Sequence, residues 1–108
     1  MIHQLRIYEI FEGTRDAFLA RFCDHAARIM RSYGFDFIAM WESRDDQRIE
    51  FVYLLRWPDE QAKNRAWEAF LADREWAEIK QTTRDQGTLV GKVEDRLLVM
   101  TDRSPAFA

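Results

Sequence analysis

Arg6 and Tyr8 are the side chains in this sequence whose types and spacing best suit chemistry on a small molecule. They lie two residues apart in an apolar, strand-like segment, so both side chains point to the same side of that strand. A guanidinium and a phenol side by side are hydrogen-bond donors for a carboxylate, enolate or quinone oxygen. We therefore predict a catalytic role for Arg6 and Tyr8 if their side of the strand faces a cavity. In the alternative interpretation, Arg6 pairs with an acidic residue across the sheet and Tyr8 is only part of a wall.

His25 is the third candidate for a catalytic role. It lies at the edge of the apolar stripe of a predicted helix, three residues after Phe22 and four before Ile29, so we expect it to be partly buried. An imidazole in such a place can act as a general acid or base near neutral pH. A core histidine that bonds a nearby carbonyl would occupy the same position. His3 is expected to be incidental.

Three further residues are predicted to bind a ligand. Trp41 is the tryptophan best placed to form the wall of a cavity, although tryptophans more often anchor cores and interfaces. Glu42 and Arg56 lie on two strands that a hairpin would pair, so their side chains could line the same cavity. Alternatively, Glu42 and Arg56 form a salt bridge at its rim.

The sequence does not predict a metal site or a bound cofactor. Two histidines and one cysteine occur without a recognisable ligand spacing. Cys23 is expected to be a small packed residue rather than a nucleophile. The four glycines are scattered and form no phosphate-binding loop. We therefore expect neither a metal nor another cofactor.

Composition places the chain among folded proteins and limits its partners. Of its 108 residues, 47% are hydrophobic and 32% are charged, which suits a single domain with its own core. The formal net charge of -3 offers no electrostatic reason to bind nucleic acid or an anionic membrane. No apolar stretch approaches the roughly 20 residues that span a bilayer, and no secretory signal is recognisable. With one cysteine, the composition favours a reducing compartment, and we expect a cytoplasmic protein.

The hydrophobic periodicity predicts four strands and two main helical regions, the second of which continues into a further helical piece. Strands are expected over residues 2–11, 35–43, 49–57 and 92–100, and helices over residues 15–33, 59–72 and 73–83. Thr14 and Asp59 are expected as N-caps, and Gly34 as the left-handed residue that ends the first helix. This β-α-β-β-α-β order closes into a ferredoxin-like α+β fold, with one four-stranded antiparallel sheet and the helices on one face. We predict a single domain over residues 1–101 and a flexible C-terminal tail over residues 102–108.

The strand predicted over residues 49–57 is apolar on both sides from Phe51 to Leu55. The helices can cover only one face of the sheet, so the other face would expose about half a dozen large apolar side chains. Each of these is worth roughly 1.5–3 kcal/mol when buried. We therefore expect a second copy of the chain to cover the open sheet face. Two sheets packed in this way form a homodimeric α/β barrel that encloses a cavity.

Several short segments, taken in order along nearly the whole chain, resemble those of a known family. They are Leu5-Arg6-Ile7-Tyr8, Phe22-x-x-His25 with Met30 and Tyr33-Gly34-Phe35, Val52 to Asp59, Ala72-Asp73-Arg74-Glu75-Trp76 and Asp95-Arg96-Leu97-Leu98. Together they resemble the NIPSNAP family, within the dimeric α/β-barrel superfamily. One departure is the loop at residues 44–48, where family members often carry glycine and this chain has charged residues. The resemblance implies the dimeric ferredoxin-like barrel, and superfamily relatives include cofactor-independent monooxygenases, haem-degrading enzymes, lactone isomerases and mutarotases.

These observations lead to two hypotheses. In the first, the barrel cavity binds a small, partly apolar organic molecule, Arg6 and Tyr8 polarise an oxygen, and His25 carries a proton. The chemistry would then be proton transfer of the kind used by cofactor-independent monooxygenases or isomerases. In the second, the dimer barrel is purely structural and the protein is a non-catalytic binding or adaptor module. The hypotheses differ in whether polar tips converge in an open, ligand-sized cavity or side chains plug the barrel.

Overall fold

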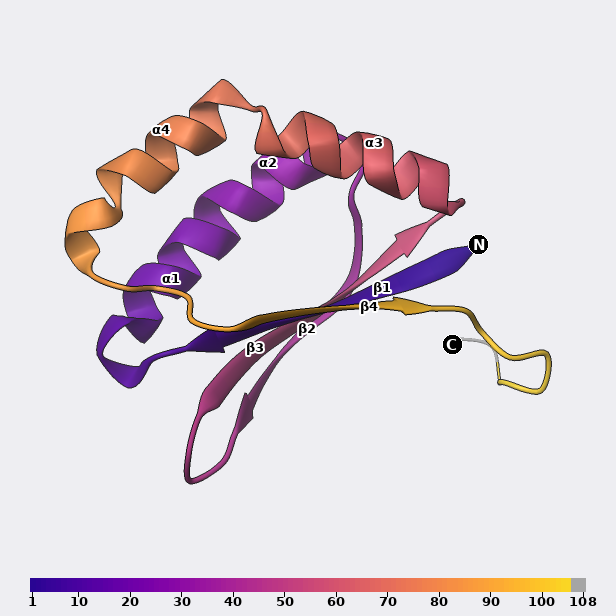
Figure 1. The fold of residues 1–108 in the computed structure, drawn as a ribbon, viewed down its shortest axis with the longest axis horizontal. Helices are drawn as coiled ribbons and strands as arrows, with labels where there is room; N and C mark the ends of the chain where they lie inside the picture. Colours follow the sequence, from indigo (N-terminus) through magenta and orange to yellow (C-terminus); the bar gives the residue numbers. More distant parts are fainter. Residues whose placement is uncertain (106–108) are drawn as a thin grey trace.

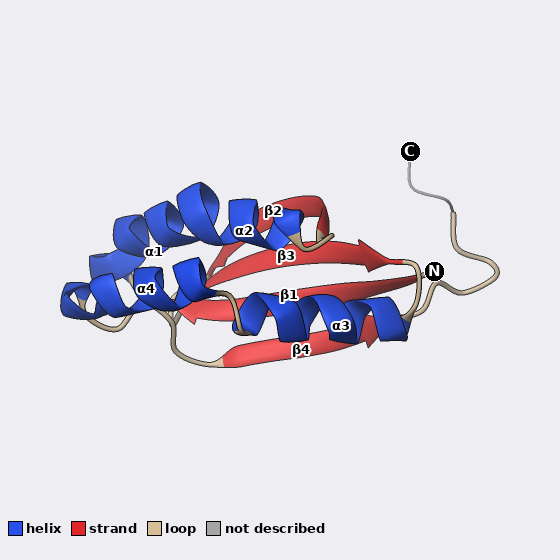
Figure 2. Ribbon diagram, turned by 90° about the horizontal axis from the view of Figure 1, so that it is seen from above, coloured by secondary structure: helices blue, strands red, loops and turns tan. Residues whose placement is uncertain are grey.

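Four strands pair in one antiparallel sheet in the order β2-β3-β1-β4, in a computed structural model that describes residues 1–105. The strands are β1 (Ile2–Ile10), β2 (Asp36–Arg44), β3 (Ile49–Trp57) and β4 (Val93–Leu98). The α-helices are α1 (Arg15–Arg21), α2 (Ala27–Ser32), α3 (Glu60–Leu71) and α4 (Arg74–Thr82). All of them lie over the same face of the sheet (Figure 1; Figure 2), which confirms the predicted α+β fold with a separate helix layer.

The ends of the predicted domain remain predictions. Residues 106–108, which belong to the predicted tail over residues 102–108, lie outside the part of the chain that the structure describes. Within residues 1–105, no helix combines the length and the apolar character needed to cross a membrane.

Strand β1 lies in the middle of the sheet, between β3 and β4, and its two sides have different surroundings. Tyr8 pairs with Phe51 of β3, and both side chains lie under the helices, where they contact Phe18. Because side chains alternate along a strand, Arg6 shares the helix-covered side with Tyr8, whereas Leu5 points to the open face. The predicted division of this strand into two sides is therefore confirmed, and the structure adds which side the helices cover.

A π-helical segment, Phe22–Ala26, joins α1 to α2 in one continuous helical region. Within this wider turn, Phe22 and Ala26 are buried, with exposed fractions of 4% and 1%. His25 is exposed, so the expectation that it would be partly buried is wrong. The expectation assumed a regular α-helical period through residues 22–26.

The helix ends follow local sequence signals with one exception. Gly34 has φ of +93°, its N–H bonds to Arg31, and the N–H of Phe35 reaches the Met30 carbonyl at 3.2 Å, which is a Schellman motif. Asp59 is the N-cap of α3, since its carboxylate accepts from the Ala62 amide at 2.8 Å. Both features confirm predictions.

Thr14 stands at the predicted N-cap position of α1, but its side chain does not cap the helix. Its hydroxyl donates to the Thr88 carbonyl at 2.8 Å and makes no capping bond, because a 3-10 turn over Glu12–Thr14 leads directly into α1. Thr14 instead ties the start of the helical region to the segment before β4.

Aromatic side chains fill the space between the sheet and the helices. Tyr8 meets Phe18 and Phe22 edge to face, with ring centroids 6.1 Å apart in both pairs. Phe22 also lies 4.9 Å from Phe51 and 5.0 Å from Tyr53. Rings of this size bury roughly 150–250 Å² each, so this cluster dominates the core. It fixes Tyr8 beneath the first helical region.

The open face of the sheet carries the apolar side chains of the strands that point away from the helices. On β3, Val52 and Leu54 point to this face, and Trp41 of β2 lies opposite Val52 with 49% of its surface exposed. Leu54 is 7% exposed because the segment after β4, with Val99 and Met100, lies across one end of this face. The rest of the face is left open in the single chain, so the predicted homodimeric barrel remains a prediction.

We predict that Gly34→Ala will lower the free energy of unfolding by roughly 1–2 kcal/mol, because an L-residue at a left-handed φ is strained. Gly13→Ala is the matched control. Added Cβ atoms meet no heavy atom within 4 Å at either position, and only Gly34 has a positive φ. Urea denaturation measures both variants, and equal destabilisation of the two would contradict the assignment.

Candidate functional site

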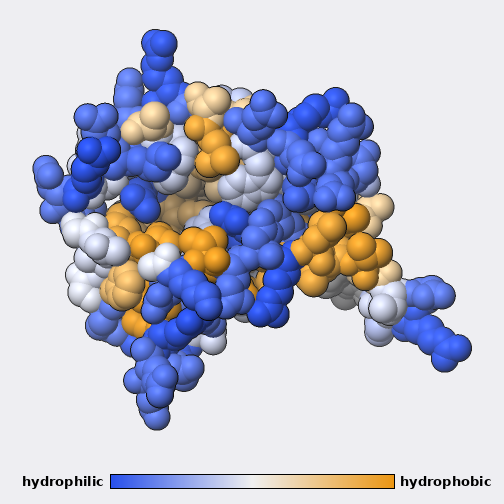
Figure 3. Space-filling view, viewed as in Figure 1, coloured by the Kyte–Doolittle hydropathy of each residue, from blue (hydrophilic) through white to orange (hydrophobic). Residues whose placement is uncertain are grey.

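A cavity of about 380 Å³ lies between the sheet and the helices. Its walls are largely aromatic and apolar, formed mainly by Phe18, Phe22, Met30, Trp67, Phe70 and Trp76. Figure 3 shows apolar side chains gathered around a recess between the helix layer and the sheet, with charged groups around it. The polar side chains that line the cavity are Arg6, Tyr8, Arg21 and Lys80. A cavity of this volume, with a mostly apolar wall and a few polar groups, is typical of small-molecule sites.

Three polar groups converge at the sheet side of this cavity. The hydroxyl oxygens of Tyr8 and Tyr53 lie 2.6 Å apart. The Arg6 guanidinium donates from Nη2 to Tyr8 at 3.2 Å and from Nε to Tyr53 at 3.4 Å. Tyr53 belongs to β3, the strand next to β1, and it lies opposite Arg6 in the β1–β3 register. Arg6 and Tyr8 thus lie together on one side of β1, as their spacing predicted, and Tyr53 joins them.

The two tyrosines differ in their surroundings. Tyr53 is fully buried, and burial together with the nearby Tyr8 oxygen raises the pKa of Tyr53 well above its ordinary value. Burial lowers the pKa of Arg6, but the phenolic oxygens of Tyr8 and Tyr53 outweigh this and raise it on balance. Tyr53 therefore keeps its proton beside a permanently charged Arg6.

The direction of the hydrogen bond between the tyrosines follows from these contacts. The Tyr53 oxygen accepts from Arg6, and among the described residues the Tyr8 oxygen is the acceptor within reach of the Tyr53 proton. When Tyr53 donates to Tyr8, the Tyr8 proton is free to point into the cavity that Tyr8 lines. Tyr8 can therefore donate a hydrogen bond to a bound ligand while Arg6 supplies positive charge beside it.

Arg6 is itself held in place from the other side. Its Nη1 donates to Asp95 of β4 at 3.2 Å, and the Gln4 amide donates to both Asp95 oxygens at 3.1 Å. The Gln4 carbonyl oxygen accepts from the indole N–H groups of Trp57 and Trp67 at 3.0 and 2.8 Å. The Arg6 guanidinium also stacks over the Trp67 ring, 4.5 Å from its centroid. The alternative prediction, that Arg6 pairs with an acidic residue across the sheet, therefore also holds.

Gln4, Tyr53 and Asp95 are parts of this site that sequence reasoning missed as functional residues. Gln4 lies two residues before Arg6, on the same side of β1 as Arg6 and Tyr8. This spacing is the sequence signal that could have identified Gln4. Tyr53 and Asp95 lie 47 and 89 positions from Arg6, and only the strand register brings them together.

The other four predicted site residues lie elsewhere. His25 is exposed on the helical region and does not line the cavity. Trp41 is on the open face of the sheet. Glu42 accepts from Arg15 at 2.6 Å, and Arg56 pairs with Asp36 at 2.9 Å, so these two residues do not pair with each other.

The position of the cavity corrects the expectation that Arg6 and Tyr8 would line a space between two sheets. Both residues lie on the helix-covered side of β1, where Tyr8 contacts Phe18 and Phe22. The helices do not fill this side completely, and the cavity is the space that remains.

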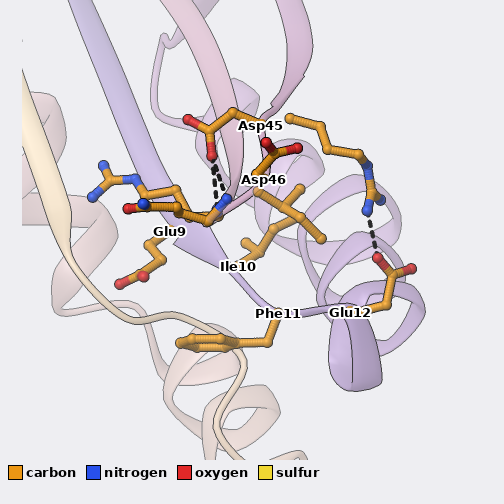
Figure 4. Close-up of a pocket in the computed structure, with 10 residues that line it drawn as sticks. Glu9, Ile10, Phe11, Glu12, Asp45 and Asp46 are labelled. Carbon is orange, nitrogen blue, oxygen red and sulfur yellow. Dashed lines mark hydrogen bonds and ion pairs between the residues drawn. The ribbon is translucent and has the colours of Figure 1, made fainter.

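A second hollow, of about 300 Å³, lies where the end of β1 meets the loop between β2 and β3 (Figure 4). Several of its charged groups bind one another or the backbone. Arg44 donates to Glu12, and the Asp45 carboxylate accepts from the amides of Gln47 and Arg48 at 2.8 and 2.9 Å. Within residues 1–105, no group of three or more His, Cys, Asp or Glu is arranged to hold a metal ion. We therefore assign this hollow to the packing of the loop.

Comparison with known proteins places the chain in a family. Its sequence matches the NIPSNAP family model over residues 3–105. An uncharacterized NIPSNAP domain protein from Burkholderia xenovorans has a similar structure, with a TM-score of 0.80 and 20% identity over 98% of this chain and 100% of that one. No curated protein is similar enough in sequence to count as a match.

Two enzymes share the fold at lower similarity. SnoaB, a cofactor-independent oxygenase from Streptomyces nogalater, has a TM-score of 0.58 and 17% identity over 97% of each chain. A monooxygenase from Streptomyces coelicolor, solved in complex with nanaomycin D, has a TM-score of 0.60 and 16% identity over 99% of this chain and 91% of that one. At such identities the likeness shows the fold alone. Because the family match covers nearly its whole length, this chain belongs to the NIPSNAP family.

Proposed function

We propose that the cavity between the sheet and the helices binds a planar, largely apolar organic molecule with an ionisable oxygen, and that it supports proton transfer on that molecule without a cofactor. The observation that carries this proposal is the convergence of Arg6 and Tyr8, with Tyr53 behind them, at one point of an otherwise apolar cavity. Donors aimed at one point in a dry site stabilise developing negative charge on an oxygen.

The chemistry follows from the charges. A ligand carbonyl or phenol that accepts from Tyr8 beside Arg6 more easily loses a proton to solvent water, from its α-carbon or its hydroxyl, since the positive charge stabilises the enolate or phenolate that forms. Returning the proton at another carbon completes an isomerisation. Alternatively, the electron pair of the anion forms a C–O bond to O₂, and protonation yields a hydroperoxide that loses water to leave a carbonyl. In that reaction the substrate is the reductant and O₂ the oxidant.

The structural neighbours support this proposal by analogy of fold. One is described as a cofactor-independent oxygenase, and another is a monooxygenase that was solved with nanaomycin D. Fold alone does not determine function, so the argument depends on the groups in the cavity of this chain.

A non-catalytic module remains the alternative, and one observation favours it. Arg6 already has a carboxylate partner in Asp95, as a purely structural arginine would. The two functions differ in whether the Tyr8 hydroxyl contributes to ligand binding and turnover or only to packing.

The open face of the sheet supports a second part of the proposal, that two copies of the chain associate through it. Leu5 and Ile7 of β1, Val52 of β3 and Trp41 of β2 all point to this face. Burying such side chains stabilises an association by roughly 25 cal/mol per Å² of apolar surface. The cavity lies on the opposite side of the sheet, so a dimer of this kind leaves it intact.

We predict that Tyr8→Phe will reduce oxidation of the probe anthrone to anthraquinone by about 100-fold or more, the loss typical of a missing hydrogen-bond donor to a developing oxyanion. The ring still packs against Phe18 and Phe22, so the fold should persist. Oxygen uptake and the absorbance of the product measure the rate. The matched control is Tyr33→Phe, which loses a hydroxyl bonded to Asp73 outside the cavity. Equal rates in native protein and Tyr8→Phe, or no binding and no turnover of anthrone by the native protein, would favour the structural alternative.

Gln4→Leu should lower the free energy of unfolding by about 2–4 kcal/mol, because it leaves the indole N–H groups of Trp57, which is buried, and of Trp67, which is partly buried, without their acceptor. Gln4 is 1% exposed. Gln81→Leu, on the exposed side of α4, is the control and should change stability by less than about 0.5 kcal/mol. Chemical denaturation measures both, and similar small effects would show that the network around Gln4 is not a structural support.

Sedimentation velocity tests the association. The native chain should sediment as a dimer at micromolar concentration, and Val52→Lys should sediment as a monomer because it places a charge in the apolar face. Ala77→Lys adds the same charge on the exposed surface of α4 and should remain dimeric. A native chain that is monomeric under these conditions would contradict the proposed dimer.

A further inference from the structure

Two cationic side chains besides Arg6 line the cavity. Arg21 is the last residue of α1, and Lys80 lies on α4. These helices are neighbours over the same end of the sheet in both ribbon views (Figure 1; Figure 2). Both cations approach the ring of Trp76, each 5.7 Å from its centroid, and both line the cavity. They therefore lie around one aromatic wall.

The depth of the polar groups gives the cavity a direction. Tyr8 is 9% exposed at the sheet side, Arg21 is half-buried and Lys80 is exposed. A ligand that reaches Tyr8 with one end therefore passes Arg21 and Lys80 with its other end. The aromatic walls between them, which include Phe70 stacked on Trp76 with centroids 5.3 Å apart, suit a flat ring system.

The charges of Arg21 and Lys80 are not neutralised within the described part of the chain. The partner of the Arg21 guanidinium is the Thr83 hydroxyl at 3.3 Å, and neither cation forms a salt bridge among residues 1–105. The described lining of the cavity contains no carboxylate, and the charge of Arg6 is already met by Asp95.

A half-buried guanidinium without a counter-charge carries a cost. Burial lowers the pKa of Arg21, because removal from water disfavours its charged form. An anion supplied from outside the chain would relieve it, because charge-assisted hydrogen bonds from Arg to a carboxylate are stronger than those to a neutral hydroxyl.

We propose that the ligand of this cavity is an aromatic acid, whose carboxylate binds Arg21 and Lys80 at the outer end while its ionisable oxygen meets Tyr8 and Arg6 at the inner end. This inference rests on the proposed function, since it names the class of molecule that the same cavity takes. It assigns Arg21 and Lys80 to substrate specificity rather than to the chemical step.

Two matched probes test it, 6-hydroxy-2-naphthoate and its methyl ester. They share the ring and the phenol and differ in one negative charge. By isothermal titration calorimetry at neutral pH, the acid should bind the native protein about tenfold more tightly than the ester. Raising the NaCl concentration should weaken binding of the acid and leave binding of the ester nearly unchanged.

The double variant Arg21→Gln, Lys80→Gln should bind the acid no more tightly than the ester, with the affinity for the ester unchanged. Binding of the ester also shows that the variant is folded. The control is Arg74→Gln, Lys92→Gln, which changes the net charge equally through two exposed residues that do not line the cavity. It should keep the tenfold preference for the acid.

The outcomes separate this inference from the function on which it rests. If the native protein binds the acid and the ester equally, the inference is overturned, and the proposed binding of an aromatic molecule stands. A preference for the acid that survives in the cavity variant, or disappears equally in the control, also overturns it. If neither probe binds the native protein, the inference and the proposed binding function fail together.

Discussion

The positive charge of Arg6 is the constraint on which the centre of this structure depends. Its side chain is 17% exposed, and a guanidinium so far removed from water needs a counter-charge and hydrogen-bond acceptors. Asp95 supplies the counter-charge, Tyr8 and Tyr53 supply oxygens, and the ring of Trp67 covers one face. These partners come from β1, β3, β4 and α3. One charge therefore links three strands to the helix layer.

The same contacts explain why a cavity persists beside so many aromatic rings. Close packing favours the collapse of side chains into any apolar space. Trp67 cannot relax in this way without losing its hydrogen bond to Gln4 or its stacking on Arg6. Phe70 packs edge to face against Trp67 and is stacked on Trp76. The walls are therefore fixed by polar and ring contacts, and the space between them stays open.

Sequence patterns predicted the layers of this fold better than the contents of its site. Alternation along β1 put Arg6 and Tyr8 on one side, and the order of elements gave one sheet with one covered face. Alternation cannot tell which side the helices cover, since both sides of β1 and β3 carry apolar residues. Arg6 and Tyr8 were therefore expected on the side of the sheet that faces a second copy, and they lie on the helix-covered side. His25 was misplaced because the π-helical turn over Phe22–Ala26 has no clear sequence signal, and helix periodicity assumes a constant turn.

Because side chains alternate along β1, the surface for a second copy and the lining of the cavity lie on opposite sides of this strand. Leu5 and Ile7 face the open side, where a second copy can pack, whereas Arg6 and Tyr8 face the cavity. Substitutions on one side of a strand change few contacts on the other, because only the backbone is shared. An interface and a ligand site can therefore vary independently in the same nine residues of β1. On this scaffold, a structural dimer and a small-molecule enzyme are compatible, and the groups in the cavity decide the chemistry.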